Sequence, residues 1–280
     1  MKLNFTKMHG CGNDYIFLNC FINDIPTPES LSILLSNRHF GIGGDGIVLI
    51  YKSEKADAKM RMFNIDGSEG KMCGNAIRCI GKYLYDNKII KKENITIETL
   101  SGTRNLILYI ENNLVSSASV DMGKSEFAPS KIPTYLEGEK IINRQVSIKG
   151  EDYKITCVSM GNPHCIIFQD DVDALDVGSI GPKIEYSPIF PERVNIEFVK
   201  VIDKSTLKMR VWERGSGETL ACGTGACAAA VAAVENGFCN KDEDIRVILT
   251  GGELVIKYTD DKVLMTGTAE KVFEGFIEIL

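Results

Sequence analysis

The hydrophobic pattern of the chain is dominated by short runs of β-branched and aromatic residues that end at Gly, Asn or Asp. Such runs are typical of β-strands. They predict strands at 15–19, 47–51, 59–63 and 95–99, and again at 164–168, 196–201, 206–212 and 245–249. Two longer apolar segments, about 75–87 and 224–236, each follow a Cys-Gly pair and predict helices. Two further helices are expected at 28–38 and near 171–175.

The chain also repeats itself at a spacing of 149 residues. The motif KMRMF at 59–63 returns as KMRVW at 208–212, and a Cys-Gly pair begins ten residues after each motif. The same spacing relates Gly12-Asn13 to Gly161-Asn162, Glu69 to Glu218 and Cys73 to Cys222. One spacing shared by four landmarks indicates two homologous halves, roughly 4–121 and 153–270, each of domain size. We therefore predict an α+β fold of two pseudo-symmetric domains from an internal duplication, each a curled, mostly antiparallel sheet around a central helix.

The composition, with 44% hydrophobic and 25% charged residues in 280, is that of ordinary globular proteins. The formal net charge of −6 and the lack of a Lys/Arg cluster argue against a nucleic-acid partner. The segment MKLNFTKMHG has no apolar signal-peptide core, and no apolar run approaches a membrane span. We expect a cytoplasmic protein with no membrane partner.

The nine cysteines form no recognisable framework, because their number is odd and neither a C-x-x-C pair nor zinc-finger spacing is present. We expect no disulfide framework and no metal. The segment GIGGDG at 41–46 matches the G-x-G-x-x-G pattern of dinucleotide sites. A strand-like run follows it where such a site needs a helix, so we expect no nucleotide.

Two of the cysteines, Cys73 and Cys222, occupy equivalent positions of the repeat, each just before a predicted helix. The helix dipole and the N–H groups of the first turn are expected to lower the thiol pKa and populate the thiolate. Two such thiols facing each other across an interdomain cleft would supply a base on one face of a carbon and an acid on the other. The adjacent helix N-termini would hold a substrate carboxylate and stabilise enolate-like charge. This arrangement predicts inversion at a carbon that bears hydrogen.

Several longer motifs then resemble one enzyme family: KMHGCGNDYIFLN, RHFGIGGDG, FNIDGSEGKMCGNAIRC, MGNPHC, PERVNIEF and ERGSGETLACGTGAC. Together, in this order from residue 7 to about 228, they resemble the diaminopimelate epimerases. Proline-type and other amino-acid racemases, which also carry paired Cys-Gly motifs, are the nearest enzymatic alternative. Two alternatives belong to other classes of protein. A thiol redox protein would form a functional disulfide, and a non-catalytic binding protein would tolerate the loss of both thiols.

The resemblance implies a cofactor-independent isomerase, without pyridoxal phosphate, that interconverts LL- and meso-2,6-diaminopimelate in lysine and cell-wall precursor biosynthesis. It implies that Cys73 and Cys222 are the acid/base pair, supported by His164 and Glu213. The substrate-binding positions that match are Asn13, Asn64, Gly74, Asn75, Asn162, Asn195, Glu213, Arg214, Gly223 and Thr224. It further implies a homodimer and two domains, 1–121 with a returning strand at 270–280, and 122–269, with the active site in the cleft between them.

The polar residues around the two thiols differ, although the thiols themselves match. The repeat pairs Asn13 with Asn162, but it pairs Asn64 with Glu213 and Asn75 with Thr224. An inversion on a substrate with a second amino-acid head group requires such asymmetry, and Arg214 is the candidate for its distal carboxylate. Many members of the resembling family have glutamine at Gly46, so a polar contact there is expected to be missing or supplied by water.

Overall fold

The computed structural model describes residues 2–21 and 24–279, and these divide into two compact units. Unit 1 comprises Met1–Val120 and Thr266–Leu280, and unit 2 comprises Asp121–Met265. Each unit pairs a mostly antiparallel sheet with a buried helix, so the predicted α+β class and the two related halves are confirmed.

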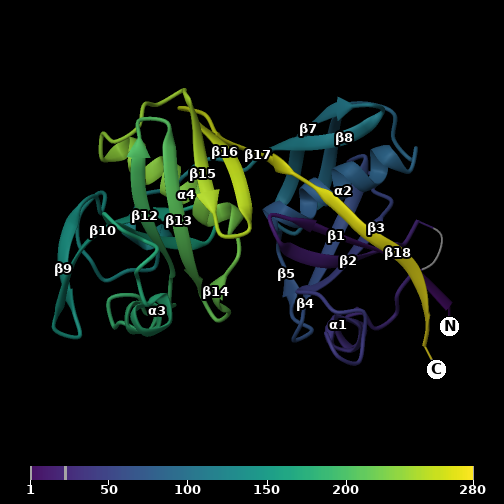
Figure 1. Ribbon diagram of the computed structural model, residues 1–280, viewed down its shortest axis with the longest axis horizontal. Coiled ribbons are helices and arrows are strands. Elements are labelled where there is room, and N and C mark those ends of the chain that lie inside the picture. Colours follow the sequence, from purple (N-terminus) through teal and green to yellow (C-terminus); the bar gives the residue numbers. More distant parts are fainter. Residues whose placement is uncertain (1, 22–23, 280) are drawn as a thin grey trace. The chain divides into compact units, whose positions relative to one another are not determined.

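Unit 1 contains one sheet in the order β18-β1-β2-β3-β4-β6-β7-β8, and the short strand β5 also pairs with β4. Only the β2–β3 and β4–β6 pairs among these are parallel. Figure 1 shows β18, in yellow, running beside β1, in purple. The elements are β1 Lys2–Gly10, β2 Asn13–Asn19, α1 Pro28–Ser36, β3 Gly46–Tyr51, β4 Ala58–Asn64, β5 Glu69–Gly70, α2 Gly74–Asp86, β6 Asn94–Thr99, β7 Gly102–Glu111, β8 Leu114–Asp121 and β18 Glu270–Glu278.

Unit 2 contains the equivalent sheet in the order β9-β10-β11-β12-β13-β15-β16, with β11–β12 and β13–β15 parallel and β14 beside β13. Its central helix α4 contacts six of these strands, and small side chains allow that close packing (Figure 1). The elements are η1 Pro129–Lys131, β9 Arg144–Ile148, β10 Glu151–Ser159, β11 Pro163–Phe168, α3 Val177–Glu185, β12 Asn195–Asp203, β13 Thr206–Glu213, β14 Gly217–Thr219, α4 Gly223–Glu235, β15 Asp244–Leu249 and β16 Gly252–Tyr258, and the strand β17 Val263–Thr268 begins in unit 2 and ends in unit 1.

The sequence repeat is a structural repeat with the same spacing. The pairs β1 and β10, α1 and α3, and α2 and α4 each begin and end 149 residues apart. The parallel register follows the same rule, since Tyr15 lies opposite Gly46 and His164 lies opposite Asn195. Gly12 and Gly161 both adopt positive φ, 80° and 91°, at the turn before the asparagine, which explains why glycine recurs there.

The recurring arginine and glutamate of the repeat form the same ion pair in both units. Arg61 Nε and Nη2 donate to the two Glu69 carboxylate oxygens at 2.7 and 3.1 Å, and Arg210 binds Glu218 in the same way at 2.8 and 3.1 Å. Each pair joins a long strand to the short strand that leads into a cysteine. The repeated motifs therefore fix the path of the chain toward the two Cys-Gly turns.

The helix expected near 171–175 is wrong: that segment is a loop, and the helix α3 begins at Val177. Arg210 Nη1 donates hydrogen bonds to the backbone carbonyls of Val172, Asp173 and Leu175 at 2.8 to 3.3 Å, and these bonds hold the loop in a non-helical conformation. The helix begins only where the Asp176 side chain accepts from the Ser179 N–H.

Gly46 is required by close packing between strands. A Cβ at this position would fall well inside van der Waals contact of the Phe63 carbonyl oxygen and 3.1 Å from Tyr15 Cε1. The glutamine common at this position in the resembling family therefore has no room here unless the backbone of β4 moves.

We predict that Gly46→Ala lowers stability by about 1–3 kcal/mol, because overpacking a sheet interior forces backbone shifts. Thermal and denaturant unfolding of the purified protein would measure the loss. Gly178→Ala is the control, because its Cβ would meet only Asp176 Oδ1 at 3.6 Å, and it should be neutral or slightly stabilising. Equal melting temperatures for wild type and Gly46→Ala would contradict the prediction.

Candidate active site

Cys73 and Cys222 are the N-cap residues of α2 and α4. Both are extended, with φ and ψ of −132° and 123° for Cys73 and −117° and 111° for Cys222. The predicted placement of each thiol before a helix is confirmed. None of the nine cysteines, all of which lie in the described part of the chain, is in a disulfide.

In unit 1, the Cys73 thiol lies in a chain of amide groups. Cys73 Sγ donates to Asn13 Oδ1 at 3.4 Å, and Asn75 Nδ2 donates to the same oxygen at 3.3 Å. Asn64, at the end of β4, instead donates to Ser68 Oγ at 3.0 Å. The structure thus brings Asn13 and Asn75 to the thiol and places the Asn64 amide on the following turn.

In unit 2, the Cys222 sulfur accepts from the Gly225 N–H at 3.4 Å and lies 3.5 Å from Thr224 Oγ1. The Glu213 carboxyl group is also a hydrogen-bond partner of this thiol. Glu213 accepts a second hydrogen bond, 2.5 Å long, from Thr219 Oγ1. A carboxyl group therefore lies beside the thiol.

His164 is fully buried between two oxygen atoms of unit 2. Its Nδ1 lies 2.7 Å from Glu197 Oε1, and its Nε2 lies 3.0 Å from Asn162 Oδ1. The ring can donate to both oxygens only when it carries the imidazolium proton. Asn162 Nδ2 in turn donates to Thr224 Oγ1 at 3.2 Å, so a continuous chain of polar groups runs from Glu197 to Cys222.

The expectation of a lowered thiol pKa is wrong for Cys222. Burial is the largest influence and raises the pKa of Cys222 well above its usual value, and the nearby Glu213 and Glu197 carboxylates raise it further. The hydrogen bonds from Thr224 and Gly225 act in the opposite direction but do not prevail. Burial also raises the pKa of Glu213, against the lowering effect of its Thr219 and Cys222 hydrogen bonds.

Asn195 and Arg214 lie beside this cluster at the ends of β12 and β13. The Asn195 amide donates to the Pro163 carbonyl at 2.8 Å and accepts from the Arg214 N–H at 2.9 Å. The exposed Arg214 side chain donates to the Glu192 carbonyl at 3.0 Å. In this structure Asn195 fixes the backbone of Arg214, whereas its role toward substrate stays a prediction.

Sequence reasoning missed four polar residues near the two thiols: Asp45, Arg78, Tyr15 and Glu197. The Tyr15 hydroxyl contacts the Asn13 and Cys73 side chains. Burial raises the pKa of Tyr15 well above its usual value, and the Cys73 and Asp45 charges raise it further. Glu197 interrupts the buried apolar run 196–199 of β12, and a carboxylate inside such a run is the signal that could have found it.

Gly225 allows Glu197 to approach the first turn of α4. A Cβ at Gly225 would lie 2.6 Å from Glu197 Oε1 and 3.3 Å from Cys222 Sγ. The second glycine of the CGTG turn therefore has a packing role directly under the thiol.

Among the residues that the structure describes, no group of three or more His, Cys, Asp or Glu side chains is arranged to hold a metal ion. Within the same residues, no helix combines the length and the apolar character needed to cross a membrane.

Comparison with known proteins relates the whole chain to one family. The family model described as "Diaminopimelate epimerase" matches residues 5–128 and 156–272, one segment in each half. The diaminopimelate epimerase of Acetivibrio thermocellus is 50% identical over 279 residues, which cover 99% of both chains. That of Methanococcus maripaludis is also 50% identical, over 99% of this chain and 100% of its own.

Solved structures share the fold at much lower identity. A phenazine biosynthesis protein of the PhzF family from Bacillus anthracis superposes with a TM-score of 0.72 at 15% identity, covering 100% of both chains. A hydroxyproline epimerase from Agrobacterium vitis gives a TM-score of 0.69 at 13% identity, covering 99% of this chain and 92% of its own. These likenesses establish the two-domain fold alone. The full-length identity near 50%, together with the two matched model segments, shows that the chain belongs to the diaminopimelate epimerase family.

Proposed function

We propose that this protein interconverts LL- and meso-2,6-diaminopimelate without a cofactor, in the cytoplasmic biosynthesis of lysine and cell-wall precursors, as a homodimer. The observation that carries the proposal is the matched pair of N-cap cysteines, one in each half of a member of this family. In this role Cys73 and Cys222 approach the substrate carbon from opposite faces.

The proposed reaction moves one proton at each sulfur. The thiolate of one cysteine takes the α-proton, so the carbon–hydrogen bond breaks and its electron pair enters the adjacent carboxylate as an enolate-like system. The thiol of the other cysteine then gives its proton to the opposite face, and the electron pair returns to carbon. We assign the N–H groups of the first turns of α2 and α4, at Gly74-Asn75 and Gly223-Thr224, to stabilise the charge that forms.

The protein must adjust the thiol protonation states to start this cycle. The raised pKa of Cys222 keeps it as a thiol in the empty enzyme, ready to act as the acid. For the reverse direction Cys222 must lose that proton, and Glu213, its hydrogen-bond partner with a raised pKa, is the acceptor we assign. The Glu197-His164 pair is connected to Cys222 through Asn162 and Thr224.

Substrate recognition requires groups that treat the two ends of diaminopimelate differently. We assign Asn13, Asn64, Asn75, Asn162 and Asn195 to the amino-acid head groups. The Arg214 guanidinium, exposed at the end of β13, is assigned to the distal carboxylate. A proline-type racemase would need no such distal group, and proline as a trial substrate separates the two activities.

We expect replacement of either Cys73 or Cys222 by Ala to abolish epimerisation, because one face of the carbon then lacks its acid or base. In D2O, wild-type product formed early from a single stereoisomer should carry deuterium at the inverted carbon, while unreacted substrate carries little. Chiral chromatography coupled to mass spectrometry measures both, and Cys239→Ala, away from the two helix N-termini, is the control that should keep its activity. Early substrate and product labelled equally would mean that a single base does the work.

We predict that Arg214→Ala reduces kcat/KM for diaminopimelate by about 100-fold, the loss of a few kcal/mol of charge-assisted hydrogen bonding. Steady-state kinetics with LL-diaminopimelate would measure it. Arg144→Ala is the matched control, because Arg144 is also exposed and donates to a backbone carbonyl, that of Glu137. If Arg214→Ala stays within about threefold of wild type, Arg214 is not part of the site.

We predict that Glu213→Gln lowers the pH at which Cys222 is half-maximally alkylated, because the negative charge that disfavours the Cys222 thiolate is removed. The midpoint should stay alkaline, since burial, the largest cause of the raised pKa, is retained. Epimerase kcat should nevertheless fall by about 100-fold, as expected when an acid–base group is lost.

Iodoacetamide alkylation followed by peptide mass spectrometry measures this midpoint. Glu151→Gln is the control, because it removes the same charge from a surface ion pair with Lys183, whereas the carboxylates that raise the pKa of Cys222 are Glu213 and Glu197. A midpoint that is unchanged or higher in Glu213→Gln would contradict the assigned contact.

A further inference from the structure

The Asn13 amide beside Cys73 is part of a hydrogen-bond chain that ends at a carboxylate on one side and at a guanidinium on the other. Its Nδ2 donates to Asp45 Oδ2 at 2.7 Å. Its Oδ1 accepts from Asn75 Nδ2 at 3.3 Å, and Asn75 Oδ1 accepts from Arg78 Nη2 at 2.9 Å. An ionised carboxylate only accepts hydrogen bonds and a guanidinium only donates them. The direction of the whole chain from Arg78 to Asp45 is therefore determined.

The two end groups are themselves firmly held. Arg78 is completely buried in α2, where Nη1 donates to the Gly74 carbonyl at 3.0 Å and Nε to the Thr268 carbonyl at 3.2 Å. Asp45 accepts from the Asp14 N–H at 3.2 Å and pairs with Arg38 Nη2 at 3.0 Å.

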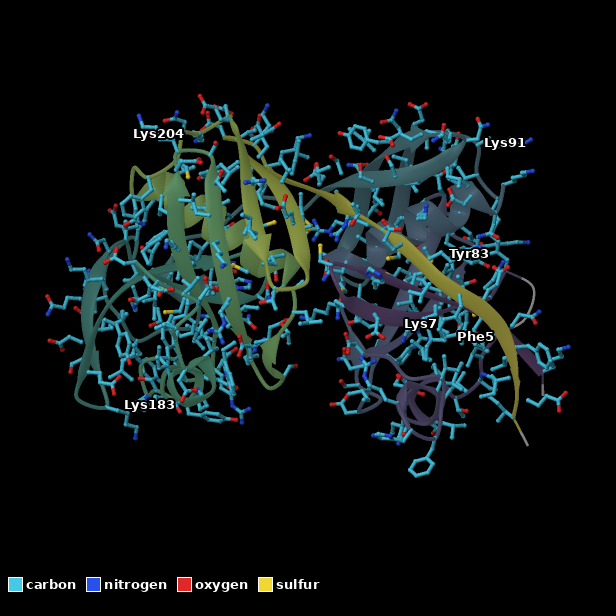
Figure 2. All side chains as sticks on the ribbon, viewed as in Figure 1. Phe5, Lys7, Tyr83, Lys91, Lys183 and Lys204 are labelled. Atoms are coloured by element: carbon cyan, nitrogen blue, oxygen red, sulfur yellow. The ribbon has the colours of Figure 1, made fainter. Side chains whose placement is uncertain are left out.

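Asp14 belongs to the same support. It pairs with Arg38 and with the buried Lys7, both at 2.6 Å. Figure 2 labels Lys7 in unit 1, and its ammonium group also reaches the Gly43 carbonyl oxygen. The Asp45 end of the amide chain is thus part of a network of ion pairs rather than a lone surface contact.

The second half of the molecule lacks both end groups and shows the opposite amide polarity. Moving 149 residues along the chain replaces Asp45 by Val194 and Arg78 by Cys227. There the matched Asn162 turns its Nδ2 toward Thr224 and its Oδ1 toward His164. The polarity at Asn13 is therefore a property of its two end groups and not of the repeat.

We propose that Asp45 and Arg78 are positioning residues that turn the Asn13 carbonyl oxygen toward the Cys73 thiol and so make the two duplicated thiols chemically unequal. A carbonyl oxygen accepts a hydrogen bond from S–H but repels a thiolate, so it favours the protonated sulfur. An amide N–H in the same place would favour the thiolate. The effect on turnover rests on the epimerase function proposed above, whereas the effect on thiol reactivity does not.

The test is the pH profile of Cys73 alkylation by iodoacetamide in Asp45→Ala. The tryptic peptide 72–78, MCGNAIR, contains Cys73 as its only cysteine, so the modified site is unambiguous. Without the carboxylate, the Asn13 amide can turn away, and the alkylation midpoint should fall by about half a pH unit. Alkylation at neutral pH should then be about threefold faster. Asp45→Asn, which keeps one carbonyl oxygen, should lie between wild type and Asp45→Ala.

Asp57→Ala is the matched control in the same unit. The Asp57 carboxylate also accepts two hydrogen bonds, from Thr96 N and Oγ1, and pairs with Lys92 at 2.7 Å, but it does not contact the Asn13 chain. Its Cys73 profile should match wild type even where its melting temperature falls. A folded Asp45→Ala protein with the wild-type profile, or an equal shift in Asp57→Ala, would overturn the proposal. If Asp45→Ala does not fold, the same comparison is made with Asp45→Asn.

The second measurement is kcat/KM for diaminopimelate, and it distinguishes failure of this proposal from failure of the proposed function. Asp45→Ala should lower kcat/KM for diaminopimelate by about tenfold, and Asp57→Ala should leave it within about twofold. If wild type does not epimerise diaminopimelate but the Cys73 profile still shifts, the proposed function fails and the positioning role stands. If wild type epimerises and neither readout moves in folded Asp45→Ala, the positioning role fails.

Discussion

The bidentate arginine–glutamate pair of each half is the constraint on which the site depends. It ties β4 to β5 in unit 1 and β13 to β14 in unit 2, and the next turn of chain delivers a cysteine to a helix N-terminus. Both pairs are partly exposed, so their contribution to stability is modest, about 1 kcal/mol or less each. Their importance lies in geometry, because two parallel hydrogen bonds fix the orientation of the strand ends. Duplication copied this device together with the thiol.

Burial and the helix dipole compete at each thiol, and at Cys222 burial prevails. A helix N-terminus favours an anion by about 0.3–1 kcal/mol at an exposed site. Removing a thiolate from water costs more than this, and the Glu213 and Glu197 charges add to that cost. A cysteine at an N-cap is therefore not an activated thiolate by position alone. At Cys222, burial and the neighbouring carboxylates together favour the protonated thiol.

Much of the fold follows from the sequence. The 149-residue spacing predicted two halves, and the predicted helices at 75–87 and 224–236 lie within one residue of α2 and α4. The helix placed near 171–175 was wrong because the run VDAL looks helical locally, whereas Arg210, distant in sequence, binds its carbonyls. The 149-residue repeat predicts this helix correctly, since the bounds of α1 shifted by 149 residues are the bounds of α3.

The polar support of the site was harder to predict for a physical reason. Asp45 meets Asn13 across 32 residues because β2 and β3 are parallel, and Arg78 reaches Asn75 from the next turn of a buried helix. Neither partner occurs in the other half, so the repeat that located the thiols gave no sign of them. What duplication preserved is the backbone and the two sulfurs, while what diverged is the set of charges that orient the amides. The proposed epimerisation would use both, with the matched cysteines as its two proton carriers and the diverged charges as the groups that make those cysteines unequal.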